Sequence, residues 1–142
     1  MIDAVTSRVA DLVPDLRSVE RMAAFAALLR DGQLPQQTPA AYVITQGLTA
    51  SRPNAIGDLY QQTVKDGISV CVVFRDIDPA GADAADRADV TIRQIIEAVA
   101  GWSANNVGTF EFTRARLAAQ QDGAFVYQID FVITDQLRFT PA

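Results

Sequence analysis

The spacing of apolar residues near the start of the chain predicts two helices. In residues 2–12 they recur every three or four positions, which places them on one helical face, and Pro14 ends this helix. Ser18 is a suitable N-cap for a second helix, and Asp31-Gly32 supplies a left-handed residue after its last turn. The apolar stripes of the two helices are Ile2, Val5, Val9 and Leu12, then Met22, Phe25, Ala26 and Leu29. Both helices are expected to face a core.

Beyond Pro39 the pattern changes from helical to extended. Residues 41–45 are rich in β-branched and aromatic side chains, which is typical of a short strand. Residues 47–57 contain Ser, Thr, Arg, Pro and Asn, and they predict a loop of about ten residues. Because loops of this length commonly carry function, we expect a partner contact at Arg52, Pro53 and Asn54; an ordinary surface loop is the alternative.

A long strand is predicted over Leu59–Arg75. In its second half apolar residues occupy both alternating faces, which indicates a central strand that is covered on both sides. Asp66-Gly67 leaves two interpretations open: a tight hairpin turn between two shorter strands, or a bulge within one long strand. We favour the single bulged strand.

The second half of the chain predicts one helix and a β-hairpin. The helix follows a loop at residues 76–81, with Asp83 as its N-cap, Gly101 at its end and Trp102 packed back over the last turn. Residues 109–116 alternate as a strand, and a turn and a second alternating strand follow. The apolar faces of the helix and the second strand are Ala88, Ile92, Ile95, Ile96 and Val99, then Phe125, Tyr127, Ile129, Phe131 and Ile133.

This order of elements predicts an α+β domain in which two or three helices pack on a mostly antiparallel sheet. The chain has 142 residues, of which 49% are hydrophobic and 20% charged, so we expect residues 1–142 to form one soluble globular domain. No basic region precedes an apolar stretch at the N-terminus, and no apolar run reaches membrane-spanning length. We therefore expect no secretory signal, no membrane contact and folding in a cytoplasm.

The composition also excludes several kinds of site. The chain has no histidine, so Ser-His-Asp and Cys-His catalytic groups and the common zinc sites cannot form. Cys71 is the single cysteine, which excludes an internal disulfide, and its position between Val70 and Val72 is that of a buried small hydrophobe. The net charge of −5 argues against nonspecific binding to nucleic acid.

Two groups of carboxylates are candidates for a metal site or a catalytic site. The first is an acidic stretch that lacks the glycine and the glutamate of an EF-hand calcium loop, so we expect a solvated surface there. The second is Glu111 and Asp130, on strands expected to be neighbours, where paired acids could act on a glycoside. We expect Arg114 or Arg116 to pair with them on the wetter face instead. The acidic stretch contains Asp76, Asp78, Asp83, Asp86 and Asp89. The sequence thus predicts no catalytic residue, no metal and no cofactor.

Five short stretches along the chain carry a family resemblance. They are Met1-Ile2-Asp3-Ala4-Val5, Gly32-Gln33-Leu34-Pro35-Gln36 leading into residues 38–43, Gln61-Gln62-Thr63 leading into Val72-Val73-Phe74-Arg75, Ala100-Gly101-Trp102, and Tyr127-Gln128-Ile129-Asp130-Phe131. In this order, in a short acidic chain, they resemble the tail terminator (tail completion) proteins of long-tailed bacteriophages and of phage-like gene transfer agents. The Asp66-Gly67 pair is a departure, because it interrupts the strand.

The resemblance implies a virion structural protein rather than an enzyme, with no cofactor. Such proteins form a hexameric ring that caps the tail tube, ends its polymerisation and joins the head-side connector. The implied partners are further copies of the chain, the tail tube protein and the connector; no specific nucleic-acid binding is implied, although DNA can pass through the ring. The implied location is the virion tail or neck, assembled in the cytoplasm of a bacterial host. The alternatives are a head–tail connector or other neck protein, and a small carboxylate-dependent hydrolase or ligand-binding domain.

Overall fold

The computed structural model describes residues 1–75, 82–104, 108–121 and 123–142. Its helices are α1 (Ile2–Leu12), α2 (Met22–Arg30) and α3 (Ala82–Val99). Its strands are β1 (Ser18–Arg21), β2 (Ala40–Ala50), β3 (Asn54–Ile56), β4 (Leu59–Arg75), β5 (Phe110–Gln121) and β6 (Ala124–Phe139). The strands form one sheet in the order β1-β2-β4-β6-β5, with β3 also paired to β4. Among the described pairs β1–β2 is parallel and the others are antiparallel, so the predicted α+β class is confirmed.

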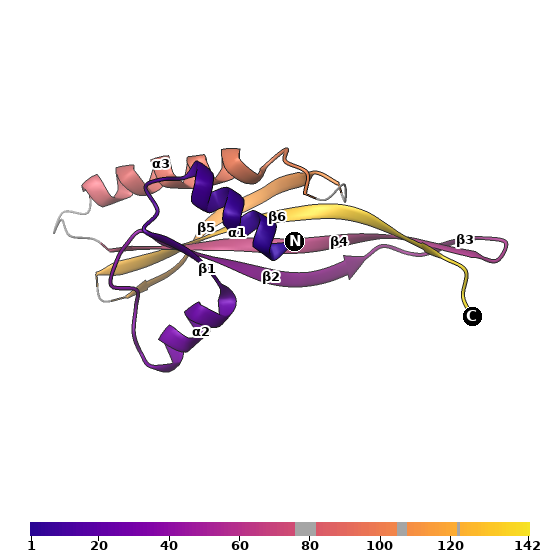
Figure 1. The fold of residues 1–142 in the computed structure, drawn as a ribbon, viewed down its shortest axis with the longest axis horizontal. Helices are drawn as coiled ribbons and strands as arrows, with labels where there is room; N and C mark the ends of the chain where they lie inside the picture. The colour runs from indigo at the N-terminus through magenta and orange to yellow at the C-terminus, as the bar shows by residue number, and fades with distance from the viewer. Residues whose placement is uncertain (76–81, 105–107, 122) are drawn as a thin grey trace.

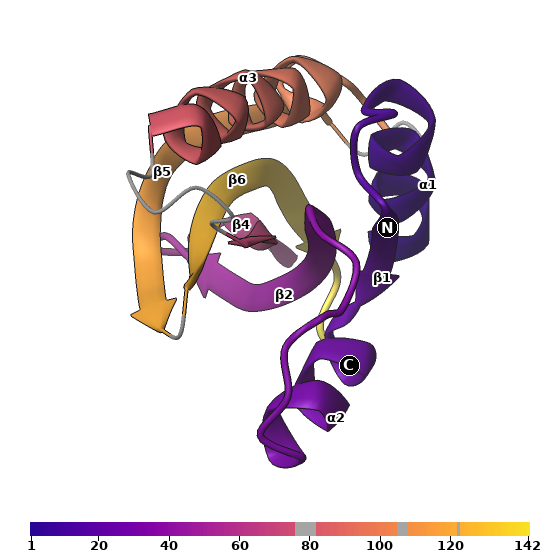
Figure 2. The ribbon, with the colours of Figure 1, turned by 90° about the vertical axis from the view of Figure 1, so that its left-hand side faces the viewer.

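The two faces of the sheet are covered differently. α1 and α3 lie side by side on one face, here called the helix face, while α2 lies on the opposite face, here called the open face (Figures 1 and 2). The main core fills the space between α1, α3 and the helix face. Its fully buried side chains include Val5, Val9, Val43, Ile68, Val70, Val72, Ile95, Val99, Ile129 and Phe131. A smaller cluster lies under α2, where the Phe25 ring stacks on Tyr42 with their centroids 4.6 Å apart.

The first helix forms where the apolar spacing predicts it, but its buried stripe ends differently. Val5 and Val9 are fully buried, and the next buried side chain is Val13, four residues further on. Leu12 therefore points away from the core and is exposed. After Val9 the helical stripe can continue three residues later at Leu12 or four residues later at Val13, and packing against the sheet selects Val13.

The second helix begins later than predicted. Ser18 is not an N-cap; it opens β1, which pairs in parallel with residues 40–43 of β2. The N-cap of α2 is Arg21, without a side-chain capping bond. Its stripe is also only partly buried, since Phe25 packs inward while Met22 and Leu29 are exposed. The four residues before α2 gain more from pairing with a sheet edge than from capping a helix. The predicted stop at Gly32 is confirmed, with φ at 67°.

The third helix is confirmed with one correction. Its predicted stripe packs into the main core, with Ile96 partly buried. Asp83 is not the N-cap, because it lies inside α3, which begins at Ala82. At the other end Gly101 has φ at 79°, and the Trp102 N–H donates to the carbonyl of Val99, so the predicted return of Trp102 over the last turn is confirmed. The predicted loop at residues 76–81 lies outside the described residues.

The central strand is continuous, which resolves the two interpretations of Asp66-Gly67. β4 runs from Leu59 to Arg75 and pairs in unbroken register with β6, so the hairpin alternative is wrong. The irregularity is in the partner strand instead: β2 has an extra residue, Gln46, opposite Gly67. A Cβ at residue 67 would lie 3.1 Å from the Gln46 Cβ. A glycine therefore leaves room for the bulged residue across the ladder.

The predicted loop at residues 47–57 is mostly strand. β2 continues to Ala50, and β3 pairs with the start of β4 through Asn54, Ala55 and Ile56. Only residues 51–53 and 57–58 connect strands. Most side chains of this segment are exposed, so it lacks the apolar alternation that marks a strand with one buried face. The C-terminal hairpin is confirmed, and β5 and β6 are both longer than the alternation alone indicates.

At one end the sheet extends beyond its helices as a narrow arm. β1 pairs only with residues 40–43 of β2, and β5 pairs with β6 only as far as Ile133. Beyond these points the described sheet consists of β4 flanked by the end of β2 with β3 on one side and by the end of β6 on the other. Figure 1 shows this part projecting away from all three helices. We call residues 46–66 and 134–140 the arm. No helix of the described chain is long and apolar enough to cross a membrane.

Candidate partner-binding surfaces

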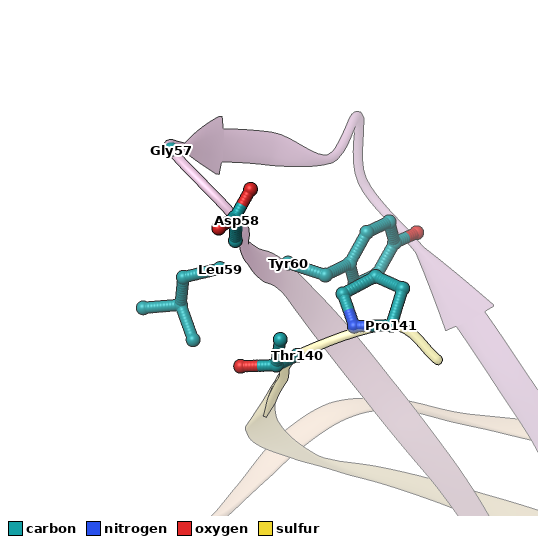
Figure 3. Close-up of a pocket in the computed structure, with 6 residues that line it drawn as sticks. All are labelled: Gly57, Asp58, Leu59, Tyr60, Thr140 and Pro141. Atoms are coloured by element: carbon teal, nitrogen blue, oxygen red, sulfur yellow. The ribbon is translucent and has the colours of Figure 1, made fainter.

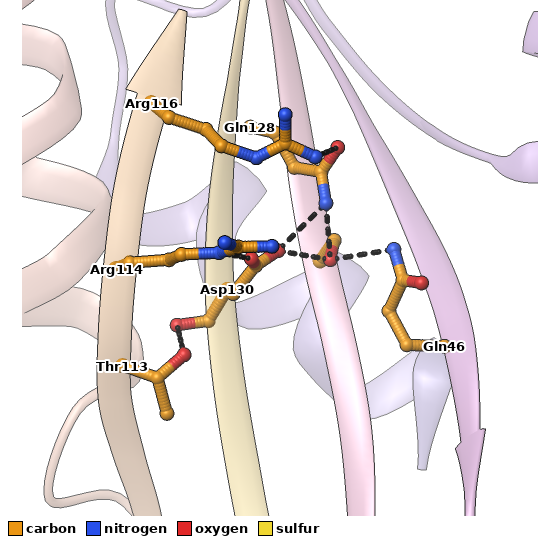
Figure 4. A network of polar contacts seen from close by, with 7 residues as sticks. Gln46, Thr113, Arg114, Arg116, Gln128 and Asp130 are labelled. Atoms are coloured by element: carbon orange, nitrogen blue, oxygen red, sulfur yellow. Dashed lines mark hydrogen bonds and ion pairs between the residues drawn. The ribbon is translucent and has the colours of Figure 1, made fainter. Parts of the chain in front are cut away.

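The open face carries a polar network centred on Asp130. The Arg114 Nε and the Gln128 Nε2 each donate to this carboxylate at 2.9 Å, and the Ser69 hydroxyl donates to it as well (Figure 4). Ser69 is fully buried, and its oxygen in turn accepts from the Gln46 Nε2 at 2.8 Å. The network therefore links β2, β4, β6 and β5. The predicted pairing of Arg114 with Asp130 is confirmed.

The surroundings of Asp130 favour its ionised form. Burial raises its pKa, but hydrogen bonds from Arg114, Ser69 and Gln128 outweigh burial, so the pKa lies below its ordinary value. A general acid at neutral pH needs a raised pKa. Glu111, the second candidate, is exposed, lies opposite Val132 and takes no part in the network drawn from the described residues. The two carboxylates share a face, but their arrangement does not resemble an acid–base pair.

Cys71 lies beside this network in the middle of β4 and is buried, as the sequence predicts. Burial raises the pKa of its thiol to about 11, with the Asp130 carboxylate adding to the effect and Arg116 opposing it. The thiol is therefore protonated at neutral pH, and a protonated thiol is a poor nucleophile.

The acidic stretch shows a solvated helix surface where it is described. Asp89 forms an exposed ion pair with Arg93 one turn further along α3, at 3.1 Å. Asp76 and Asp78 lie outside the described residues. Within the parts of the chain that the structure describes, no group of three or more acidic or cysteine side chains could hold a metal ion.

The predicted contact residues Arg52, Pro53 and Asn54 lie on the arm. All three are exposed; Arg52 and Pro53 lie in the short connection between β2 and β3, and Asn54 is the first residue of β3. The connection is fixed to β4 through Ser51, whose N–H donates to the Thr63 carbonyl at 3.0 Å. The predicted exposure of this segment agrees with the structure, but the predicted long loop is replaced by a short connection between two strands.

The tip of the arm has an open hollow of about 430 Å³. The Tyr60 ring and Pro141 both line it (Figure 3). The Tyr60 ring also packs on Phe139, with ring centroids 5.0 Å apart. The remaining lining residues are Gly57, Asp58, Leu59 and Thr140. The lining mixes apolar side chains with one carboxylate and has no cationic residue, so it suits contact with a protein rather than with an anion.

Two sets of apolar side chains on the helix face lie beyond the cover of α1 and α3. On the arm, Leu48, Leu137 and Phe139 are exposed, and we call them the arm patch. On the edge strand β5, Phe112 and Leu117 are exposed, and we call them the edge patch. The sequence predicts neither patch. The arm patch has one signal in the sequence: apolar residues continue at alternate positions after Ile133, at Leu137 and Phe139.

Comparison with known proteins identifies the family. The family model for the phage tail terminator protein matches residues 2–140. A comparison with curated proteins finds no match. Among solved structures, a chain in the virion of a native gene transfer agent particle is similar, with 16% identity, 94% of this chain and 92% of that chain covered, and a TM-score of 0.46. Because the family model spans nearly the whole chain, this protein belongs to the phage tail terminator family and is a structural protein of the phage tail.

Proposed function

We propose that six copies of this chain form a ring that caps the tail tube, ends its polymerisation and joins the tail to the head-side connector. Membership of the tail terminator family supports this role, since the family model covers residues 2–140. The match over residues 2–140 also supports the proposal that residues 1–142 act as one domain. The protein then resides in the tail or neck of the virion and is assembled in the cytoplasm of the bacterial host.

The observation that carries the proposal is the arm. The main core is complete without it, yet the arm exposes both faces of a three-stranded sheet together with Leu48, Leu137 and Phe139. Three strands without a covering layer are marginal in water, and exposed apolar patches mark binding surfaces. A protein that works by joining other proteins needs such a surface, whereas an enzyme needs a cleft with convergent polar groups.

The arm also carries the residues proposed to contact the tail tube. Arg52, Pro53 and Asn54 are exposed beside the hollow at its tip. A guanidinium can bind a carboxylate of the tube subunit through two parallel hydrogen bonds, and proline reduces the flexibility of the connection. Substitution here leaves the main core intact, because the arm lies outside it.

Charge reversal on the arm tests this function. Particles are produced with the wild-type chain, with Arg52→Glu, or with Arg87→Glu as the control. Arg87 is also exposed, but it lies on α3 away from the arm. With Arg52→Glu we expect electron microscopy to show tails of abnormal length or tails without heads, and with Arg87→Glu normal particles.

The location of the chain provides the second readout. A cryo-EM map of intact particles should place its density as a ring at the head-proximal end of the tube. Density elsewhere in the neck would favour a head–tail connector instead. Normal, infectious particles with Arg52→Glu would show that the tube contact lies on another surface of the ring.

A further inference from the structure

We infer that the arm patch of one copy docks on the edge patch of the next copy, so that the ring closes through a repeated arm-to-edge contact. This inference rests on the proposed function, because it assigns the surface through which the ring forms. The arm would then support its neighbour rather than project freely, and each copy would contribute a different surface to its two neighbours.

The first argument is that the two patches cannot meet within one molecule. Phe112 and Leu117 are level with Phe131 and Tyr127 on β6, whereas Leu137 and Phe139 lie further along the same strand. At roughly 3.3 Å per residue, Leu137 and Phe139 lie about 20–40 Å from the edge patch along β6. Leu48 lies on β2, three strands across the sheet from β5. The patches therefore have separate places on one chain, and any contact between them is between copies. Contacts between two different patches of identical chains generate a ring when the rotation from copy to copy closes.

The second argument is that the patches match in spacing. Leu48 of β2 pairs with Asp66 of β4, which pairs on its other side with Ile133 of β6. Leu137 lies four residues beyond Ile133 along β6. Phe112 and Leu117 are level with two positions of β6 that are also four residues apart. Each pair of side chains is therefore about 13 Å apart along the strand direction. Between Leu48 and Leu137 the buried Val64 fills the surface of the arm, so the patch is continuous.

The third argument is charge, which disfavours the symmetric alternative. Asp66 and Asp135 lie on the same face as the arm patch, so two arms packed face to face would bring four carboxylates together. Desolvation already raises the pKa of Asp66, and a second carboxylate would add to that cost. On β5, the face that carries the edge patch has no carboxylate, because Glu111 lies on the open face together with Arg114 and Arg116. An arm that packs on this edge patch therefore avoids the repulsion between carboxylates that two packed arms would suffer.

The fourth argument is that β5 is built for contact through side chains. Its ladder with β6 is irregular at two places, between Phe112 and Arg114 and between Leu117 and Ala119. Bulges break the register of an edge and prevent a long new strand from pairing with it.

Cysteine cross-linking between two single variants tests the contact. Leu137→Cys places a thiol on the arm patch and Leu117→Cys places one on the edge patch, while the native Cys71 is buried and stays unreactive. The two variants are purified separately, mixed, and oxidised with copper–phenanthroline, alone and in assembled particles. We expect a disulfide-linked dimer in the mixture and little in either variant alone. Efficient linkage of Leu137→Cys to itself would show arm-on-arm packing and overturn the inference, as would the absence of linkage in the mixture both in solution and in particles.

Serine substitution on opposite faces of the arm gives an independent measurement. Leu48→Ser removes a side chain of the arm patch that is 69% exposed, and Ile56→Ser removes one that is 65% exposed on the open face of the same arm. We expect Leu48→Ser to weaken self-association by roughly tenfold to a hundredfold, the value of burying one leucine, and Ile56→Ser to leave it unchanged. Circular dichroism verifies that both variants fold. Equal effects of the two substitutions would overturn the assignment to the helix face.

The failure of this inference is distinguishable from failure of the proposed function. If cryo-EM places the chain as a ring on the tube while the mixed variants do not cross-link, the cap exists and the contact between copies lies elsewhere. If the chain is absent from the end of the tube, the proposed function is wrong whatever the cross-linking shows.

Discussion

The Ser69 hydroxyl donates a hydrogen bond to the Asp130 carboxylate across two strands of the open face, and Ser69 is fully buried. Ser69→Ala removes this donor and also removes the acceptor of the Gln46 amide. We expect the free energy of unfolding to fall by about 1–3 kcal/mol, the cost of leaving buried polar groups unsatisfied. Urea titration measures the change. Thr134→Ala, exposed on the same face, is the control and should change stability by less than about 0.5 kcal/mol.

The lowered pKa of Asp130 predicts an acid-labile contribution to stability. A carboxyl whose folded pKa is below its unfolded value stabilises the fold above the unfolded pKa, and this contribution is lost as the pH falls through the folded pKa. The wild type should therefore lose stability on acidification below about pH 4, the ordinary range for aspartate. Asp130→Asn lacks this dependence, so the difference in unfolding free energy between the two should shrink at low pH. A constant difference from pH 7 to pH 2 would contradict the assignment.

Cys71 should be unreactive until the protein unfolds. Its thiol is buried and its pKa is raised to about 11, so neither access nor ionisation favours attack at pH 8. We expect negligible labelling by a thiol reagent such as DTNB in buffer and complete labelling in concentrated urea. Thr49→Cys provides an exposed thiol on the arm and should be labelled at once. Rapid labelling of native Cys71 would show that β4 opens easily.

Two glycines differ in what an added methyl group would meet. Gly101 has φ at 79° and open space around it, whereas Gly108 has φ at 135° and a Cβ there would lie 2.9 Å from the Thr134 carbonyl oxygen. We expect Gly108→Ala to lower the melting temperature more than Gly101→Ala, with a free-energy difference of about 2 kcal/mol or more, because it adds a backbone clash to strain. Thermal unfolding followed by circular dichroism compares the two. Equal melting temperatures would mean that the start of β5 shifts to accept the methyl group.

Helices and strands that bury one face could be predicted from the sequence. β6 alternates from Phe125 to Ile133, and α3 repeats its apolar residues from Ala88 to Val99, because each element has one side against the main core. The same reasoning fails where burial is absent. The second half of β2 is exposed, so residues 47–57 are predicted as a loop although the backbone of residues 47–50 and 54–56 pairs with β4.

The candidate surfaces were harder to predict for a related reason. Arg114 and Asp130 could be paired from neighbouring alternating strands, but Ser69 and Gln46 join them only because of the register of β2, β4 and β6. Leu48 and Phe139 are far apart in the sequence, and nothing in either segment alone indicates that both belong to one surface. The register between strands that are distant in the sequence determines which side chains share such a surface. A single sequence contains little information about that register.

The pairing of β4 with β6 also sets the order in which the chain can fold during synthesis. β4 lies between β2, which precedes it, and β6, which leaves the ribosome last of the sheet's strands. The β2–β4 hairpin can form early, but one whole edge of β4 stays unpaired until residues such as Phe139 emerge to meet Tyr60. Contacts between distant segments form slowly, and unpaired edges aggregate. A ribosome that stalls before β6 would therefore expose a long apolar strand, so nascent chains of this protein are expected to depend on chaperones in that interval.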